Sequence, residues 1–101
     1  IDQHKLKNTV AFTDILKQFT HIKAVICGHV HQDSITLWNN IQFISTPATC
    51  IQFKPLSHNF ALDHIAPGYR CLHLKADGQL ETMVHRLENY SITINEEISG
   101  Y

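Results

Sequence analysis

Apolar side chains recur at intervals of three and four between residues 8 and 19, and this spacing predicts an amphipathic helix. The stripe consists of Phe12, Ile15, Leu16 and Phe19. Asn8 stands before it, where its side chain could accept a hydrogen bond from a free N–H of the first turn. Residues 23–27 (KAVIC) follow as a short, β-branched apolar run, which is typical of a strand buried on both faces. A helix followed by such a strand favours an α/β layer.

Two apolar segments further on have the pattern of a β-hairpin. Residues 34–38 (SITLW) and 41–45 (IQFIS) flank Asn39 and Asn40. Because asparagine tolerates positive φ, this pair predicts a two-residue turn. Residues 46–68 contain all three prolines and are expected to be mostly irregular. A loop this long in a compact domain usually has a function or lines a site.

A second hairpin is predicted from YRCLHLK and QLETMVHRL, which flank residues 76–78. A two-residue Asp-Gly loop would mix apolar and charged faces. A three-residue loop with Gly78 in the left-handed region pairs Leu74 with Leu80 and His73 with Glu81. This register is preferred because it puts the charged residues on one face and an apolar set on the other: Leu72, Leu74, Leu80 and Val84. His73 then faces solvent and is not a ligand.

Composition is that of a globular chain. The 101 residues are 44% hydrophobic and 17% charged, which suits one domain or a piece of one. The net charge of −1 offers no basic surface for nucleic acid. No apolar run reaches the length of a membrane helix, and no leader is visible, so neither membrane insertion nor secretion is indicated. The chain begins at Ile1 without methionine, which suggests the tail of a longer protein, and residues 88–101 are polar and expected to be loosely held.

Three cysteines, Cys27, Cys50 and Cys71, are odd in number and form no CxxC pattern. Each lies in an apolar stretch, so we predict buried free thiols in a reducing compartment, the cytoplasm. Eight histidines equal the lysines and arginines in number, which mildly favours metal chemistry.

The pattern Gly28-His29-Val30-His31 directly follows the predicted strand. In extended backbone, residues i and i+2 project to the same side, so both imidazoles could reach one metal or two adjacent metals. Gly28 would leave room for a ligand. The carboxyl end of a strand in an α/β sheet is also where ligands usually bind. Two histidines do not complete a zinc site, which needs three or four protein ligands, and they could also be unrelated surface residues.

Other polar residues have weaker claims to a role in binding. Thr46, Thr49 and Ser45 could hydrogen-bond a phosphate, although a turn with satisfied hydroxyls is the simpler interpretation. Arg70 is expected to pair with Asp63 across the APG turn. Lys54 and Arg70 could also meet an anionic substrate, but solvated surface charge is simpler.

Several of these motifs together resemble a known family. KAVICGHVHQD, STPATCIQFKP, APGYR and LKADGQLETMVHRL stand in the order found in the carboxyl-terminal part of the calcineurin-like metallophosphoesterases. Within that family the chain looks most like class III cyclic nucleotide phosphodiesterases that act on cyclic AMP. The resemblance implies an α/β fold, a four-layer sandwich to which this chain gives one helix, one buried strand and two β-hairpins. Residues 1–101 would be the carboxyl-terminal segment of a single catalytic domain whose amino-terminal part is absent.

The resemblance also implies a site. His29 would bind one and His31 the other of two divalent metal ions, iron, manganese or zinc, with Gly28, Thr46 and Thr49 near the substrate. The family's remaining ligands and its leaving-group acid lie upstream, so this segment holds no catalytic residue of its own. The isolated chain is therefore expected to be inactive towards a cyclic nucleotide or another phosphodiester.

An alternative is a non-catalytic binding or interaction module, with a structural metal or none at the histidine pair. If the chain is the truncated segment of a catalytic domain, the strand at residues 23–27 would lack part of its cover. We therefore expect a homo-oligomer to form through exposed apolar surface.

Overall fold

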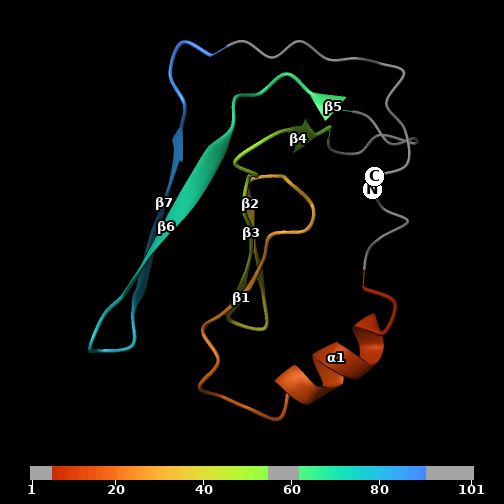
Figure 1. Cartoon of the computed structure of the whole chain (residues 1–101). Coiled ribbons are helices and arrows are strands. Elements are labelled where there is room, and N and C mark those ends of the chain that lie inside the picture. The colour runs from red at the N-terminus through yellow and green to blue at the C-terminus, as the bar shows by residue number, and fades with distance from the viewer. Residues whose placement is uncertain (1–5, 55–61, 91–101) are drawn as a thin grey trace.

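The computed structural model describes residues 6–54 and 62–90, which form one helix and three small sheets (Figure 1). Helix α1 spans Thr9–Leu16, and strands β1 (Ala24–Cys27), β2 (Ser34–Trp38) and β3 (Ile41–Ser45) form a three-stranded sheet. Short strands β4 (Gln52–Phe53) and β5 (Leu62–Asp63) pair with each other, and β6 (Gly68–Leu74) pairs with β7 (Leu80–Arg86). The predicted mixed class of one helix and two hairpins is confirmed. The predicted loose tail falls largely on residues 91–101, which lie outside the described residues.

Helix α1 is shorter than the predicted stripe. Leu16 is buried, whereas Ile15 and Phe19 remain exposed. Asn8 occupies the N-cap position, but its side chain makes no capping hydrogen bond, so that prediction was wrong. Its backbone carbonyl instead accepts from the Phe12 N–H at 3.0 Å, as the first helical turn requires. The helix has eight residues and is too short to cross a bilayer, and the described residues contain no other helix.

The three-stranded sheet has β3 at its centre. β3 runs parallel to β1 and antiparallel to β2, and Ser45 is in register with both Cys27 and Ser34. The predicted turn between β2 and β3 is confirmed, because Asn39 and Asn40 have φ values of 51° and 60°. Two successive left-handed residues form the type I′ turn, whose twist matches that of the strands it joins.

The apolar pattern of β1 predicts burial on both faces, which the described residues do not provide, in line with the expectation that this strand lacks part of its cover. Within residues 6–54 and 62–90, β1 is an edge strand that pairs only with β3, and Ile26 and Cys27 at its end are exposed. By contrast, Ile41 and Ile44 on the central strand are each 2% exposed. β1 has the sequence of a covered strand, but among the described residues no second layer covers it. The predicted self-association through such apolar surface stays a prediction.

The three thiols are also exposed rather than buried. Cys27 ends the edge strand, Cys50 lies in a bend, and Cys71 faces outward on the β6–β7 hairpin. Apolar neighbours in the sequence therefore did not predict burial of the three thiols, because the apolar core of the described residues is small. It consists of Leu16, Ile41, Ile44 and Phe53.

The β6–β7 hairpin has the predicted register. Leu74 pairs with Leu80 and His73 with Glu81, and Gly78 has a φ of 87° in the three-residue loop. His73 is exposed, with its Nδ1 3.7 Å from a Glu81 carboxylate oxygen. The predicted separation of charge from the apolar face is wrong at two positions. Arg70 pairs with Val84 and so lies on the leucine face. Arg86, opposite Gly68, lies on the same face as Leu80 and Val84.

Replacing Gly78 with alanine is expected to lower the free energy of unfolding by about 1–2 kcal/mol, the cost of a left-handed backbone for an L-residue. Gly28→Ala is the matched control, because a Cβ at either glycine would meet nothing within 4 Å and only Gly78 has a positive φ. The control should stay within about 0.5 kcal/mol of the parent in urea unfolding. Equal effects of the two variants would contradict this account of the turn.

Candidate metal-ligand loop

The candidate histidines lie in the connection between β1 and β2. Those two strands flank β3 on opposite sides, so residues 28–33 have to pass the carboxyl end of β3. We call this connection the arch. Its base is closed by a hydrogen bond of 3.1 Å from the Thr46 N–H to the Cys27 carbonyl, just beyond Ser45. The arch therefore presents His29 and His31 at the end of the sheet where the sequence predicted a site.

The backbone of the arch is a turn and not the extended segment that we predicted. His31 has a φ of 52°, and its N–H donates to the Gly28 carbonyl at 3.4 Å. The chain has to reverse direction between β1 and β2, and this reversal requires a turn here. Strand alternation is therefore not the reason why the two histidines would act together.

The ring of His31 is held on two sides. Its Nδ1 lies 2.9 Å from the Ile51 carbonyl oxygen, and the ring stacks on Phe53 with centroids 4.2 Å apart and planes inclined by 5°. A carbonyl oxygen only accepts hydrogen bonds, so Nδ1 is the donor, and in the neutral tautomer of this ring the lone pair is on Nε2. Metal-ligating histidines commonly have this arrangement, in which one ring nitrogen donates to a carbonyl and the other binds the metal.

The other members of the motif are more open. His29 is exposed, and the space where a Gly28 side chain would lie is empty of heavy atoms within 4 Å. Among residues 6–54 and 62–90, no group of three or more histidine, cysteine or acidic side chains is placed to hold a metal ion. The chemistry of His31 fits a metal ligand, but the described residues supply at most part of a metal site, because three or four protein ligands are usual.

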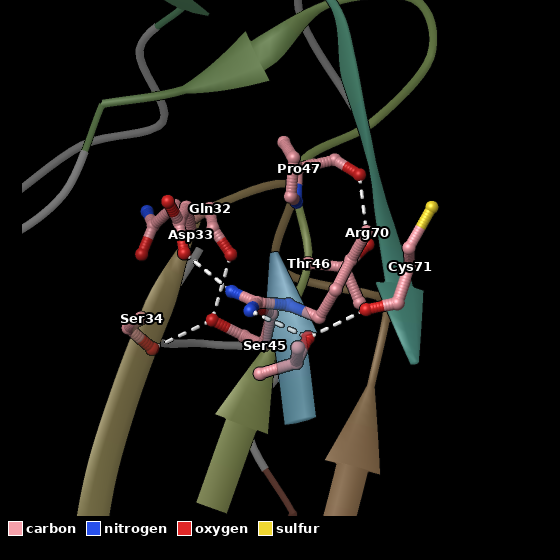
Figure 2. A network of polar contacts seen from close by, with 9 residues as sticks. Gln32, Asp33, Ser34, Ser45, Thr46, Pro47, Arg70 and Cys71 are labelled. Atoms are coloured by element: carbon pink, nitrogen blue, oxygen red, sulfur yellow. Dashed lines mark hydrogen bonds and ion pairs between the residues drawn. The ribbon is translucent and has the colours of Figure 1, made fainter. Parts of the chain in front are cut away.

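A buried polar network lies next to the arch (Figure 2). Arg70 forms an ion pair with Asp33 and donates to the Ser45 carbonyl at 3.1 Å. The predicted Arg70–Asp63 pair is therefore wrong, and the Asp63 carboxylate accepts instead from the His64 N–H at 2.8 Å. The prediction that Arg70 is a solvated surface charge is also wrong, because its side chain is 3% exposed.

The hydroxyl groups predicted to lie near the site are mostly satisfied within the protein. The Ser45 hydroxyl donates to the Gln32 carbonyl at 2.7 Å, and the Thr46 hydroxyl donates to the Pro47 carbonyl at 2.8 Å. Thr49 is exposed. Their part in substrate binding stays a prediction.

A shallow cleft of about 240 Å³ adjoins the arch. Its lining includes His31, Asp33, Phe53, Asp63 and Arg86. Small-molecule sites usually measure about 300–1,000 Å³, so this cleft alone is small for a substrate pocket.

The chain is similar over its whole length to curated proteins of one kind. It is 46% identical over 101 residues to the 3',5'-cyclic adenosine monophosphate phosphodiesterase CpdA of Escherichia coli K12 and to that of Vibrio vulnificus, and covers 37% of each. The CpdA of Pseudomonas aeruginosa is 35% identical over the same length, with 37% covered. A 3',5'-cyclic-nucleotide phosphodiesterase of Nostoc is 32% identical over 99 residues, 98% of this chain and 37% of that protein.

The chain thus spans about 37% of the length of the curated relatives that it matches, at their carboxyl-terminal end. No family model and no solved structure matches it. The resemblance to cyclic AMP phosphodiesterases that the motifs indicated is confirmed.

Proposed function

Because this chain is similar over its full length to the carboxyl-terminal part of cyclic nucleotide phosphodiesterases, we propose that the protein containing it hydrolyses 3',5'-cyclic nucleotides, cyclic AMP first among them. The observation that carries the proposal is the match of all 101 residues to several curated cyclic AMP phosphodiesterases at 35–46% identity. The role of this chain would be to supply part of a metal site from the arch.

His29 and His31 are the residues that would hold metal, one ion each. Two divalent ions, when bound, would supply Lewis-acid chemistry at the phosphate and would stabilise negative charge there. Imidazole suits iron, manganese and zinc. The carbonyl of Ile51 and the ring of Phe53 hold the imidazole of His31 in one orientation, which supports its assignment. The remaining ligands would come from the part of the full-length protein that corresponds to the unmatched part of the relatives.

Gly28, Thr46 and Thr49 are proposed to border the substrate. The open space at Gly28 supports its inclusion, because a side chain at that position would project into it. The polar side chains of the two threonines are compatible with a phosphate. The three cysteines are free thiols, which supports a reducing compartment, so we also propose the cytoplasm as its location.

The test is an assay of cyclic AMP hydrolysis by the full-length protein with manganese, zinc or iron supplied. We expect release of adenosine monophosphate that stops when the metal is chelated and resumes when the metal is restored. The 101-residue chain alone should give no turnover above buffer, because two imidazoles fall short of a metal site. Hydrolysis that survives exhaustive chelation, or equal rates from the isolated chain, would contradict the proposal.

A further inference from the structure

The proposed function leaves one nearly fully buried cation without a role. The Arg70 side chain is 3% exposed (Figure 2). Among the described residues, its hydrogen bonds are made by the two terminal nitrogens and none by Nε. One terminal nitrogen donates to the Thr82 hydroxyl at 3.1 Å, within the β6–β7 hairpin. The other donates to the Asp33 carboxylate and to the Ser45 carbonyl. A single guanidinium therefore joins this hairpin to the arch and to the end of β3.

The groups that Arg70 contacts are linked to the backbone of His31. Asp33 ends the arch, two residues after His31. The hydroxyl of Ser45, whose carbonyl Arg70 binds, donates to the Gln32 carbonyl at 2.7 Å, and the Gln32 side-chain amide donates to the Phe53 carbonyl at 3.3 Å.

Phe53 closes this chain of contacts. Its N–H donates to the His31 carbonyl at 3.3 Å, and its ring stacks on the imidazole. Arg70 and Ser45 therefore fix residues 32 and 33, the end of the arch that leads into β2. Phe53 contacts both the backbone and the ring of His31.

We propose that Arg70 is a positioning residue that fixes the arch so that His31 presents Nε2 in one orientation. The inference deepens the proposed function and rests on it for the metal that Nε2 would bind. Arginine suits this task because its planar fork bonds three acceptors in fixed directions, whereas a lysine ammonium offers a point charge. Loss of the guanidinium would remove both the ion pair to Asp33 and the hydrogen bond to the Ser45 carbonyl, so the arch would no longer be tied to the β6–β7 hairpin.

The test uses the full-length protein and the variants Arg70→Met, Arg70→Lys and Asp33→Asn. Lys75→Met is the matched control, because it removes an ion pair of 2.6 Å with Glu81 from the same hairpin without touching the arch. Long-range ¹H–¹⁵N spectra of the metal-free protein report which ring nitrogen of His31 carries the proton. Calorimetric titration with manganese reports affinity, and thermal unfolding shows that each variant is folded.

The parent and Lys75→Met should show a single His31 tautomer protonated at Nδ1. Arg70→Met and Arg70→Lys should show mixed protonation and about tenfold weaker manganese binding or more, the range found when partners of metal ligands are removed. Should Arg70→Met fail to fold, Asp33→Asn, whose side chain is partly exposed, should still shift the His31 signals.

An unchanged His31 spectrum in folded Arg70 and Asp33 variants would overturn the proposal. If the Arg70 variants change the His31 spectrum but the parent protein binds neither manganese, zinc nor iron, Arg70 is still the positioning residue and the proposed function is refuted. The two failures are therefore distinguishable.

Discussion

His31→Ala is expected to lower both metal affinity and cyclic AMP hydrolysis of the full-length protein by at least about a hundredfold, because removing even an outer partner of a metal ligand costs 10- to 100-fold. The ring nitrogen that would bind the metal is already set by the hydrogen bond from Nδ1 to the Ile51 carbonyl. Alanine removes the nitrogen, and the described residues contain no group of three or more histidine, cysteine or acidic side chains that could hold the ion instead. Steady-state hydrolysis and manganese titration measure the two losses.

The controls separate the imidazole from the backbone. His31 has a φ of 52°, a conformation that asparagine also adopts readily, so His31→Asn keeps the turn and removes the ring. Both variants should lose activity to a similar extent. His73→Ala, at an exposed position of the β6–β7 hairpin, should retain the activity of the parent. An active His31→Asn variant would show that the shape of the turn, and not the imidazole, is what the site requires.

The second large effect is expected at Phe53. Its side chain is 1% exposed, and it is one of the few fully buried apolar groups of the described residues. Phe53→Ala should cost about 3–5 kcal/mol through lost burial and the cavity left behind. A typical domain has only about 5–15 kcal/mol in total, so unfolding of the full-length protein should shift markedly.

Urea unfolding measures the loss at Phe53, with Met83→Ala as the control. Met83 is 62% exposed on β7, so its truncation should change the free energy of unfolding by no more than about 0.5 kcal/mol. Phe53→Leu should lose less than Phe53→Ala because it fills most of the space. A loss under about 1 kcal/mol for Phe53→Ala would mean that β4 is not part of the core.

The elements that the sequence predicts well are those decided by near neighbours. The Asn39-Asn40 turn and the three-residue loop with Gly78 depend on backbone preferences and on pairing within one hairpin, and both have the predicted register. The helix and the location of the histidine pair after β1 were also found from local patterns.

The features that the sequence did not reveal depend on distant parts of the chain. Arg70 and Asp33 are 37 residues apart, and Asp63, nearer in sequence, was the plausible but wrong partner. The exposure of Ile26 and Cys27 depends on what covers the sheet, which the local pattern of β1 does not contain. The left-handed His31 follows from the reversal of the chain around β3, which requires knowing the strand order.

That strand order also has a consequence for biosynthesis. The ribosome adds His29 and His31 to the chain before it makes β3, the strand that lies between β1 and β2 in the sheet. The nascent loop can therefore take its final shape only once residues 41–45 have left the exit tunnel. The imidazole of His31 gains its stacking partner later still, when Phe53 emerges.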